Sequence, residues 1–320
     1  MPYLIKSKYK PPYLFRNGHT ATMYSGVIKK TIAPKYEQET WELADGDFLQ
    51  VDVRIRNTDR AVILCHGLEG DSQSGYINTA ADYFIRRGYS VFAWNNRSCG
   101  GTINRLPQLY HHGSAEDLET VVQRVSDRRF NNIYLLGHSL GGAQILSYLG
   151  RHTIPDTVRA AVAVSTPIQL KSSAQMINKG LSRIYARRFI KSYKKKVLTK
   201  AQTFPHLLDI HQVRRIKRFE DIANSFMVPV HGFTDLEDYY QRASPESTLD
   251  CIRTPALVLN AWNDPMLGTQ DYPVEMAHYH SSLFLETPHH GGHCAFPMPH
   301  SYHSYAEVRA YAFFEEISSI

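Results

Sequence analysis

The stretch Tyr134-Leu135-Leu136-Gly137-His138-Ser139-Leu140-Gly141-Gly142 decides the fold. The apolar run 132–136 is typical of a buried strand, and 141–149 has the character of a helix start. Between them lies Gly-x-Ser-x-Gly, in which small residues are needed because the backbones crowd around the turn. This strand–serine–helix context predicts a nucleophile elbow that lifts the Ser139 hydroxyl out of the sheet, where the helix dipole favours negative charge. The alternative is a glycine-rich turn with a capping serine.

Strands and helices alternate on both sides of this stretch. Two short runs, 40–43 and 48–55, flank Asp45-Gly46-Asp47 and predict a hairpin. An antiparallel start followed by strand–helix repeats predicts an α/β fold with a mostly parallel sheet and helices on both faces. The expected strands are 61–65, 89–94, 132–136, 158–164, 256–260 and 282–285, and the expected helices are 76–87, 115–129, 141–149 and 305–317.

One basic stretch interrupts the alternation. Residues 171–220 hold fourteen Lys and Arg against two acidic residues, Asp209 and Glu220, whereas the whole chain of 320 residues has a formal net charge of +6. We expect one domain over 1–320, with 168–245 inserted as a basic helical cap. The cap would cover the C-terminal edge of the sheet, where ligands bind in open α/β folds.

Composition describes a soluble globular protein. Hydrophobic residues make up 43% and charged residues 21% of the chain, and no apolar run is long enough to span a membrane. Four scattered cysteines and the absence of a signal-like N-terminus predict a cytoplasmic protein with reduced thiols. Residues 1–35 are expected to form an arm over the surface, with a turn at Asn17-Gly18-His19-Thr20.

A serine needs a base, and the base needs a third group to orient it. Asp264 directly follows the strand 256–260, at the same sheet edge as the elbow, and Pro265 bends the chain away. His293 lies in a glycine-rich loop after the strand 282–285. These residues predict a catalytic Ser139, Asp264 and His293, with Asp235 and Asp238 as rival acids that no clear strand precedes.

The histidines leave other assignments open. His289 and His290 compete with His293 as the base, and the three could also ligate a metal. Gly291 and Gly292 argue against a helix that presents His289 and His293 on one face, and no further ligand joins them. Neither a metal nor an organic cofactor is expected.

A serine that attacks a carbonyl also needs two N–H donors for the negative oxygen of the tetrahedral intermediate. One donor is expected to be the Leu140 amide, which directly follows the nucleophile. The second is expected to be the Leu68 amide in His66-Gly67-Leu68-Glu69-Gly70, because the glycines let that loop turn its amides inwards. The alternative is an ordinary glycine-rich turn.

These motifs together resemble the α/β-hydrolase superfamily, and in detail its YheT-like branch. The resemblance spans nearly the whole chain, although the branch usually has Pro-His where this chain has Gly18-His19. It implies a carboxylester hydrolase, an alcohol acyltransferase or a phospholipid-cleaving relative, with the triad on Ser139, Asp264 and His293. The further matching segments are Arg16-Asn17-Gly18-His19-Thr20-Ala21-Thr22, Asn95-Asn96-Arg97-Ser98-Cys99-Gly100-Gly101, Tyr110-His111-His112-Gly113, Asp238-Tyr239-Tyr240 with Ala243-Ser244, and Asn263-Asp264-Pro265.

We therefore expect a serine hydrolase that cleaves small-molecule carboxylic esters, with an acyl chain in the cap. Acyl transfer to an alcohol by the same triad and a non-catalytic protein that binds membrane surfaces are the alternatives. The basic cap predicts contact with anionic lipid or with an acidic substrate rather than with nucleic acid, because no nucleic-acid motif accompanies it. His112 and Asp117 have the HxxxxD spacing of some acyltransferases, although Asp117 also suits the first turn of a helix.

Overall fold

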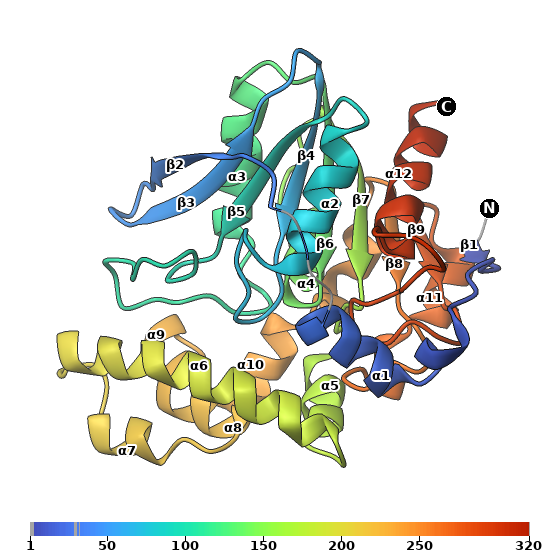
Figure 1. Ribbon diagram of the computed structural model, residues 1–320. Coiled ribbons are helices and arrows are strands. Elements are labelled where there is room, and N and C mark those ends of the chain that lie inside the picture. Colours follow the sequence, from blue (N-terminus) through green and yellow to red (C-terminus); the bar gives the residue numbers. More distant parts are fainter. Residues whose placement is uncertain (1–2, 29–30, 32, 320) are drawn as a thin grey trace.

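The computed structural model describes residues 3–28, 31 and 33–319. In this part of the chain nine strands form one sheet in the order β1-β9-β8-β7-β6-β4-β5-β3-β2 (Figure 1). In this order the neighbouring strands from β1 through β5 pair in parallel, and the pairs β5–β3 and β3–β2 are antiparallel. The strands are β1 (Tyr3–Ile5), β2 (Glu37–Glu42), β3 (Phe48–Arg54), β4 (Arg60–Cys65), β5 (Ser90–Asn95), β6 (Asn132–His138), β7 (Val158–Val164), β8 (Ala256–Leu259) and β9 (Leu283–Glu286).

The central strands are buried on both faces, as their continuous apolar sequences require. Every residue of β5 and β8 is buried, and β6 is buried after its first residue. The predicted mostly parallel sheet is confirmed, and so is the hairpin, in which Glu42 pairs with Phe48 across Asp45-Gly46-Asp47. The order of the strands brings the C-terminal ends of β4, β6, β8 and β9 to one edge of the sheet.

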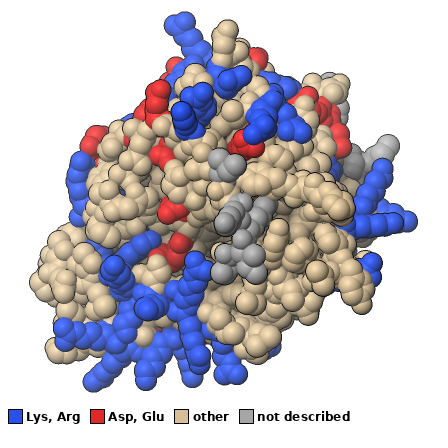
Figure 2. Space-filling model, in the orientation of Figure 1, with Lys and Arg blue, Asp and Glu red and all other residues tan. Residues whose placement is uncertain are grey.

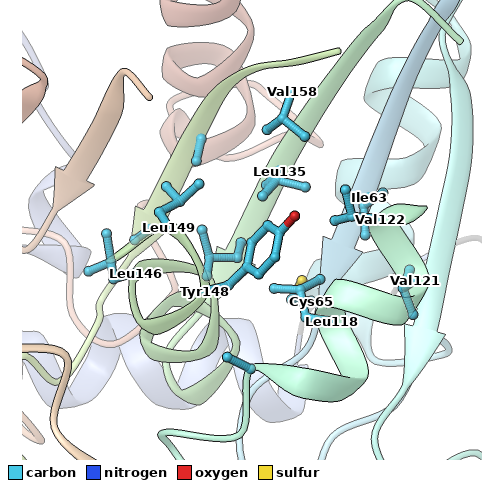
Figure 3. Close-up of a cluster of buried hydrophobic side chains, with 14 of the residues drawn as sticks. Ile63, Cys65, Leu118, Val121, Val122, Leu135, Leu146, Tyr148, Leu149 and Val158 are labelled. Carbon is cyan, nitrogen blue, oxygen red and sulfur yellow. The ribbon is translucent and has the colours of Figure 1, made fainter. Parts of the chain in front are cut away.

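Helices cover both faces of the sheet. The helices α2 (Gly75–Ile85) and α12 (Tyr305–Ser318) pack on one face, and α3 (Glu116–Asp127) and α4 (Leu140–Arg151) pack on the other (Figure 1). Figure 3 shows the second interface, where Leu118 and Val122 of α3 and Leu146 and Leu149 of α4 meet strand residues such as Leu135. These helical residues recur every three or four positions, which is the spacing that buries one helix face.

Six helices, of which α6 is the longest, form a separate layer beyond the edge where β6 meets α4 (Figure 1). We call residues 168–245 the helical layer. Its buried apolar side chains, such as Tyr193, Val197 and Phe226, form a cluster that includes Leu140 of the elbow. The helices are α5 (Leu170–Ile177), α6 (Ser182–Thr203), α7 (Ile210–Arg215), α8 (Phe219–Ile222), α9 (Val228–His231) and α10 (Leu236–Ala243), with the π-turn η3 (Ala223–Met227) before α9.

The N-terminal segment differs from the expected surface arm. The strand β1 extends the sheet by pairing in parallel with β9, and three residues are too few to show a strand pattern in sequence. The predicted turn at 17–20 is wrong, because α1 (Gly18–Met23) begins there. The Asn17 side chain accepts hydrogen bonds from the backbone N–H groups of His19 and Thr20, so this residue acts as a helix N-cap rather than a turn former.

Shorter elements complete the described chain. The turns η1 (Tyr13–Phe15) and η2 (Tyr24–Ile28) flank α1, and η4 (Pro245–Cys251) and η5 (Thr269–Asp271) lie on either side of β8. The helix α11 (Val274–Tyr279) precedes β9. No helix in the described ranges has the length and apolar character that a membrane crossing requires.

Candidate active site

Ser139 occupies the turn between β6 and α4 with φ 54° and ψ −120°, a strained conformation for a residue other than glycine. The neighbouring glycines are needed for steric reasons. A Cβ on Gly137 would lie 2.5 Å from the Gly141 carbonyl carbon, and a Cβ on Gly141 would lie 2.3 Å from the Cys65 carbonyl oxygen. The crowding expected from the spacing is therefore present, and the turn raises the serine at the sheet edge.

The structure brings His293 and Asp264 to this serine. The distance from His293 Nε2 to Ser139 Oγ is 2.9 Å, and His293 Nδ1 lies 3.0 and 2.9 Å from the two Asp264 carboxylate oxygens. The two residues lie in the loops after β9 and β8, whose ends meet beside the elbow. Such a chain of contacts can move a proton from the serine hydroxyl to the imidazole while the carboxylate holds the ring.

Burial and charge act in opposite directions on the histidine. Burial disfavours the charged ring, but the Asp264 carboxylate and the nearby Cys294 raise the pKa of His293 well above its ordinary value. Asp264 is 3% exposed, and its Oδ1 also accepts a hydrogen bond from the Met266 N–H at 2.9 Å. Burial, and then the His293 charge, lower the pKa of His138 to about 3, so this neighbour stays neutral.

The rival acids and bases have other surroundings. The Asp235 side chain caps α10, and Asp238 forms an ion pair with Arg242. The His290 Nδ1 lies 2.8 Å from the Arg16 carbonyl oxygen, and His289 is exposed. Within the described ranges, no group of three His, Cys, Asp or Glu residues is placed to hold a metal ion.

The N-terminal helix α1 holds the histidine loop, a role that sequence reasoning did not assign. The His293 N–H donates to Thr22 Oγ1 at 2.9 Å. The Asn263 side chain accepts from the Gly292 N–H at 3.1 Å and donates to the Arg16 carbonyl at 2.9 Å. A Cβ on Gly18 would lie 1.9 Å from the Asn263 carbonyl oxygen, so the glycine permits this close packing. The resemblance of the segment 16–22 to the YheT-like branch was the one sequence signal that pointed to this helix.

Leu68 and Leu140 lie beside the serine and line the same cavity. The amides on both sides of Leu68 are already used, because the Gly67 N–H donates to Tyr76 Oη at 2.8 Å and the Glu69 N–H to Tyr110 Oη at 2.9 Å. Among the described residues, nothing accepts a hydrogen bond from the Leu68 or the Leu140 amide. A Cβ on Gly67 would lie 3.2 Å from Ser139 Cβ, so this loop passes directly against the serine.

A cavity opens next to Ser139 and His293, between the sheet edge and the helical layer. Its walls are mostly apolar and aromatic, and the other lining residues are His111, His112, Ser139, Ser173 and His293. Apolar pockets with a few placed polar groups are the usual form of small-molecule sites. The apolar and aromatic residues that line it are Leu68, Tyr110, Leu140, Pro167, Leu170, Ala174, Ile177, Phe189, Tyr193, Phe219, Ile222, Ala223, Met227, Tyr239, Tyr240, Met266 and Leu267.

The HxxxxD pair does not form a second dyad in the structure. Asp117 lies in the first turn of α3, and both of its carboxylate oxygens accept from the Arg97 guanidinium, at 2.7 and 2.8 Å. His112 lines the cavity instead, and burial lowers the pKa of this ring to about 4. The carboxylate is therefore committed to an ion pair and not to the histidine.

The chain belongs to the α/β hydrolase fold family, whose model matches residues 60–297. It is 30% identical over 294 residues to YheT of Escherichia coli (strain K12), a candidate esterase by name, with 88% of this chain and 85% of that protein covered. It is also 27% identical over 289 residues to the phospholipase ABHD3 of Mus musculus, covering 90% of this chain and 67% of that protein. The resemblance to α/β hydrolases and to the YheT-like branch is thus confirmed.

Solved structures agree on the fold. The esterase Pf2001 of Pyrococcus furiosus superposes with a TM-score of 0.56 at 14% identity and covers 91% of this chain and 98% of its own. A membrane phospholipase A, described as a bacterial virulence factor, has a TM-score of 0.56 at 17% identity and covers 89% of this chain and 87% of its own. At these identities the likeness supports the architecture alone.

Proposed function

We propose that this protein hydrolyses carboxylic esters, with Ser139 as nucleophile, His293 as base and then acid, and Asp264 as the group that orients the histidine. The observation that carries the proposal is the unbroken series of contacts from Ser139 Oγ through the His293 ring to the Asp264 carboxylate. Relatives named as an esterase and a phospholipase support the same class of reaction.

The reaction proceeds in two halves. Ser139 Oγ attacks the ester carbonyl carbon as its proton passes to His293 Nε2, and the tetrahedral oxyanion accepts hydrogen bonds from the Leu68 and Leu140 amides. The carbonyl re-forms, the alkoxide leaves with the proton from His293, and an acyl-serine remains. Water then attacks the acyl carbon as its proton passes to His293. The second tetrahedral intermediate collapses, the bond to Ser139 Oγ breaks, the serine takes the proton back from His293, and the acid leaves. The N-terminus of α4 adds electrostatic stabilisation to the oxyanion.

The cavity supports an acyl chain as the buried part of the substrate. Its apolar walls come largely from α5, α6, α8 and η3 of the helical layer, which we propose acts as a cap over the site. Removing an alkyl chain from water contributes about 0.8 kcal/mol for each buried CH₂ group. We therefore expect a preference for esters with a longer acyl group over acetate esters.

Hydrolysis of p-nitrophenyl esters of increasing acyl length tests this function. The proposal expects turnover by the native protein, a rise in kcat/KM with acyl length up to the capacity of the cavity, and loss of turnover in Ser139→Ala. Ser147→Ala is a matched control, because Ser147 is also a buried serine but lies within α4, outside the triad. Turnover that survives in Ser139→Ala would contradict the proposal.

We also propose that the helical layer contacts anionic membrane surfaces. Figure 2 shows Lys and Arg side chains gathered along the lower edge of the molecule, over the region of α6 and α7 in Figure 1. Two large apolar side chains, Leu181 and Ile184, are 61% and 62% exposed at the start of α6. Exposed cations beside exposed apolar side chains suit a lipid interface. The exposed basic residues are Lys171, Lys179, Arg183, Arg187, Arg188, Lys191, Lys195, Arg214, Arg215, Lys217 and Arg218.

The run Lys194-Lys195-Lys196 is not a uniform solvated face. Lys195 is exposed, but Lys194 donates to the Arg214 and Ile216 carbonyls, and Lys196 forms an ion pair with Glu69. A charge-reversal test should therefore use Arg187, Lys191 and Lys195, which are exposed and spaced four residues apart on one face of α6.

Sedimentation with vesicles of phosphatidylcholine, with and without phosphatidylglycerol, tests the membrane proposal. The expected result is binding to the anionic vesicles that the Arg187→Glu, Lys191→Glu, Lys195→Glu variant loses. A variant with Lys6, Lys8 and Lys10 changed to Glu has the same change in net charge at exposed positions far from α6. Equal loss in both variants would show a general charge effect and would contradict a role for α6.

A further inference from the structure

The loop that presents Leu68 contains a buried carboxylate. Glu69 follows Leu68 directly, adopts a left-handed backbone with φ 55°, and has a side chain that is 3% exposed. The Glu69 carboxylate accepts a hydrogen bond from Tyr110 Oη at 2.7 Å. The Glu69 backbone N–H donates a hydrogen bond to the same tyrosine oxygen at 2.9 Å. A non-glycine residue in this conformation persists only where its surroundings hold it.

The counter-charge comes from the helical layer. Lys196 of α6 places its ammonium 2.8 Å from Glu69 Oε1, and its side chain is 15% exposed. The same ammonium lies 3.1 Å from Cys99 Sγ and 5.4 Å from the centre of the Tyr110 ring. Ser192, one helical turn earlier, donates a second hydrogen bond to Glu69. Glu69 is thus bound by two side chains of α6 and by one tyrosine outside it.

We propose that the Glu69–Lys196 ion pair is a positioning device that fixes the Leu68 N–H for the oxyanion and makes the catalytic rate depend on the docked helical layer. The inference rests on the proposed ester hydrolysis. Neither residue touches the reacting atoms, so both act through the peptide that carries the Leu68 amide.

The ion pair can position the Leu68 amide because the peptide that carries it is held at both ends. Tyr76 holds the Gly67 amide, and the Tyr110–Glu69 ring of hydrogen bonds holds the next amide after Leu68. Burial disfavours the Lys196 charge, but Cys99 and Glu69 raise the pKa of the ammonium, which stays protonated. If α6 moved away, the Glu69 carboxylate would lose both its cation and the Ser192 hydrogen bond, so the loop that it holds would have to rearrange.

The same cluster gives a role to the segment 95–101, which matched a family motif with no assigned function. Cys99 contacts the Lys196 ammonium, and the Cys99 N–H donates to the Asn96 carbonyl at 2.8 Å, which fixes the thiol in place. The Asn96 N–H in turn donates to His66 Nε2 at 3.1 Å, at the start of the Leu68 loop. The segment therefore supports the ion pair and the oxyanion loop together.

The experiment compares Lys196→Met with Lys194→Met, a lysine on the same helix that bonds to the Arg214 and Ile216 carbonyls and not to Glu69. It measures kcat and KM on a p-nitrophenyl ester, and the inhibition constant of a trifluoromethyl ketone, which forms an oxyanionic adduct with the serine. The double variant Glu69→Gln with Lys196→Met leaves no unpaired buried charge, so it provides the test if the single variant does not fold. A change in KM alone would indicate a merely structural effect on the pocket.

The expected result is a fall in kcat of about tenfold or more for Lys196→Met and for the double variant, with KM within about twofold and an equal loss of ketone affinity. Lys194→Met should match the native protein. Native kcat and ketone affinity in both Lys196 variants would overturn the inference and leave the proposed function intact. If the native protein neither hydrolyses esters nor reacts with a fluorophosphonate, the proposed function fails, and this inference fails with it.

Discussion

Thr22 Oγ1 accepts a hydrogen bond from the backbone N–H of His293 at 2.9 Å, and the two residues are 271 positions apart in the sequence. The same hydroxyl donates to the Gly18 carbonyl at 2.7 Å, so the threonine is fixed on α1. The N-terminal helix is therefore part of the support for the histidine loop, although β1 and α1 lie outside the repeating strand–helix units of the sheet.

Thr22→Val should remove this support with little change in side-chain volume. We expect kcat to fall about three- to tenfold, which corresponds to the loss of about one hydrogen bond. Thr20→Val is the control, because Thr20 is exposed and its hydroxyl bonds only to the Leu14 and Asn17 carbonyls. Steady-state kinetics of both variants check the prediction, and a larger fall for Thr20→Val than for Thr22→Val would contradict it.

The pH dependence follows from the protonation of His293. The ring must be neutral to accept the serine proton, and the Asp264 carboxylate, against the effect of burial, holds the pKa of His293 above its ordinary value. We expect kcat/KM to fall in acid with a slope of one, and the inflection to lie above pH 6.5. A profile that stays flat from pH 9 to pH 5 would contradict His293 as the base.

Asp264→Asn tests both roles of Asp264, which are to orient the His293 ring and to stabilise its protonated form. The amide cannot stabilise the imidazolium and favours the wrong tautomer, so kcat should fall about a thousandfold or more. The inflection of any residual activity should shift to lower pH, because the Coulombic cause of the raised His293 pKa is removed. Asp235→Asn is a matched control in the N-cap of α10 and should keep native kcat. An unshifted inflection in Asp264→Asn would contradict the assignment.

Arg97 offers a prediction on stability. Its guanidinium lies among Asp45, Asp47 and Asp117, and its side chain is 11% exposed. Arg97→Met should lower the free energy of unfolding by about 3–5 kcal/mol, because buried carboxylates lose their cation. Arg86→Met, which breaks an exposed pair with Asp82, should change it by less than about 1 kcal/mol. Urea unfolding of both variants measures the difference, and equal effects would contradict the burial argument.

The sequence predicted the parts of the structure that have a local cause. The apolar runs of β4 to β9, the amphipathic α3 and the glycine spacing around Ser139 are each determined by nearby residues. The order Ser, Asp, His along the chain and the position of Asp264 after a strand were enough to select residues that the structure brings together.

Features that depend on contacts between distant parts of the chain were not predicted from the sequence. The strand β1 exists because β9 offers a free edge, and α1 begins at Asn17 because that side chain caps it in place of forming a turn. Lys196 belongs to the basic cap for which the sequence predicted contact with anionic lipid, and its ion pair with the buried Glu69 could not be read from the sequence. The domain boundaries of the helical layer stay a prediction.

The central claim is that Ser139 is a nucleophile activated by His293. Reaction with a fluorophosphonate, followed by peptide mass spectrometry, tests it most directly, because the probe becomes covalently bound only to an activated serine. The account predicts a phosphonate adduct on the peptide that contains Ser139, with strongly slowed labelling in His293→Ala and none in Ser139→Ala. An adduct at another residue, or equal labelling of the His293→Ala variant, would contradict it.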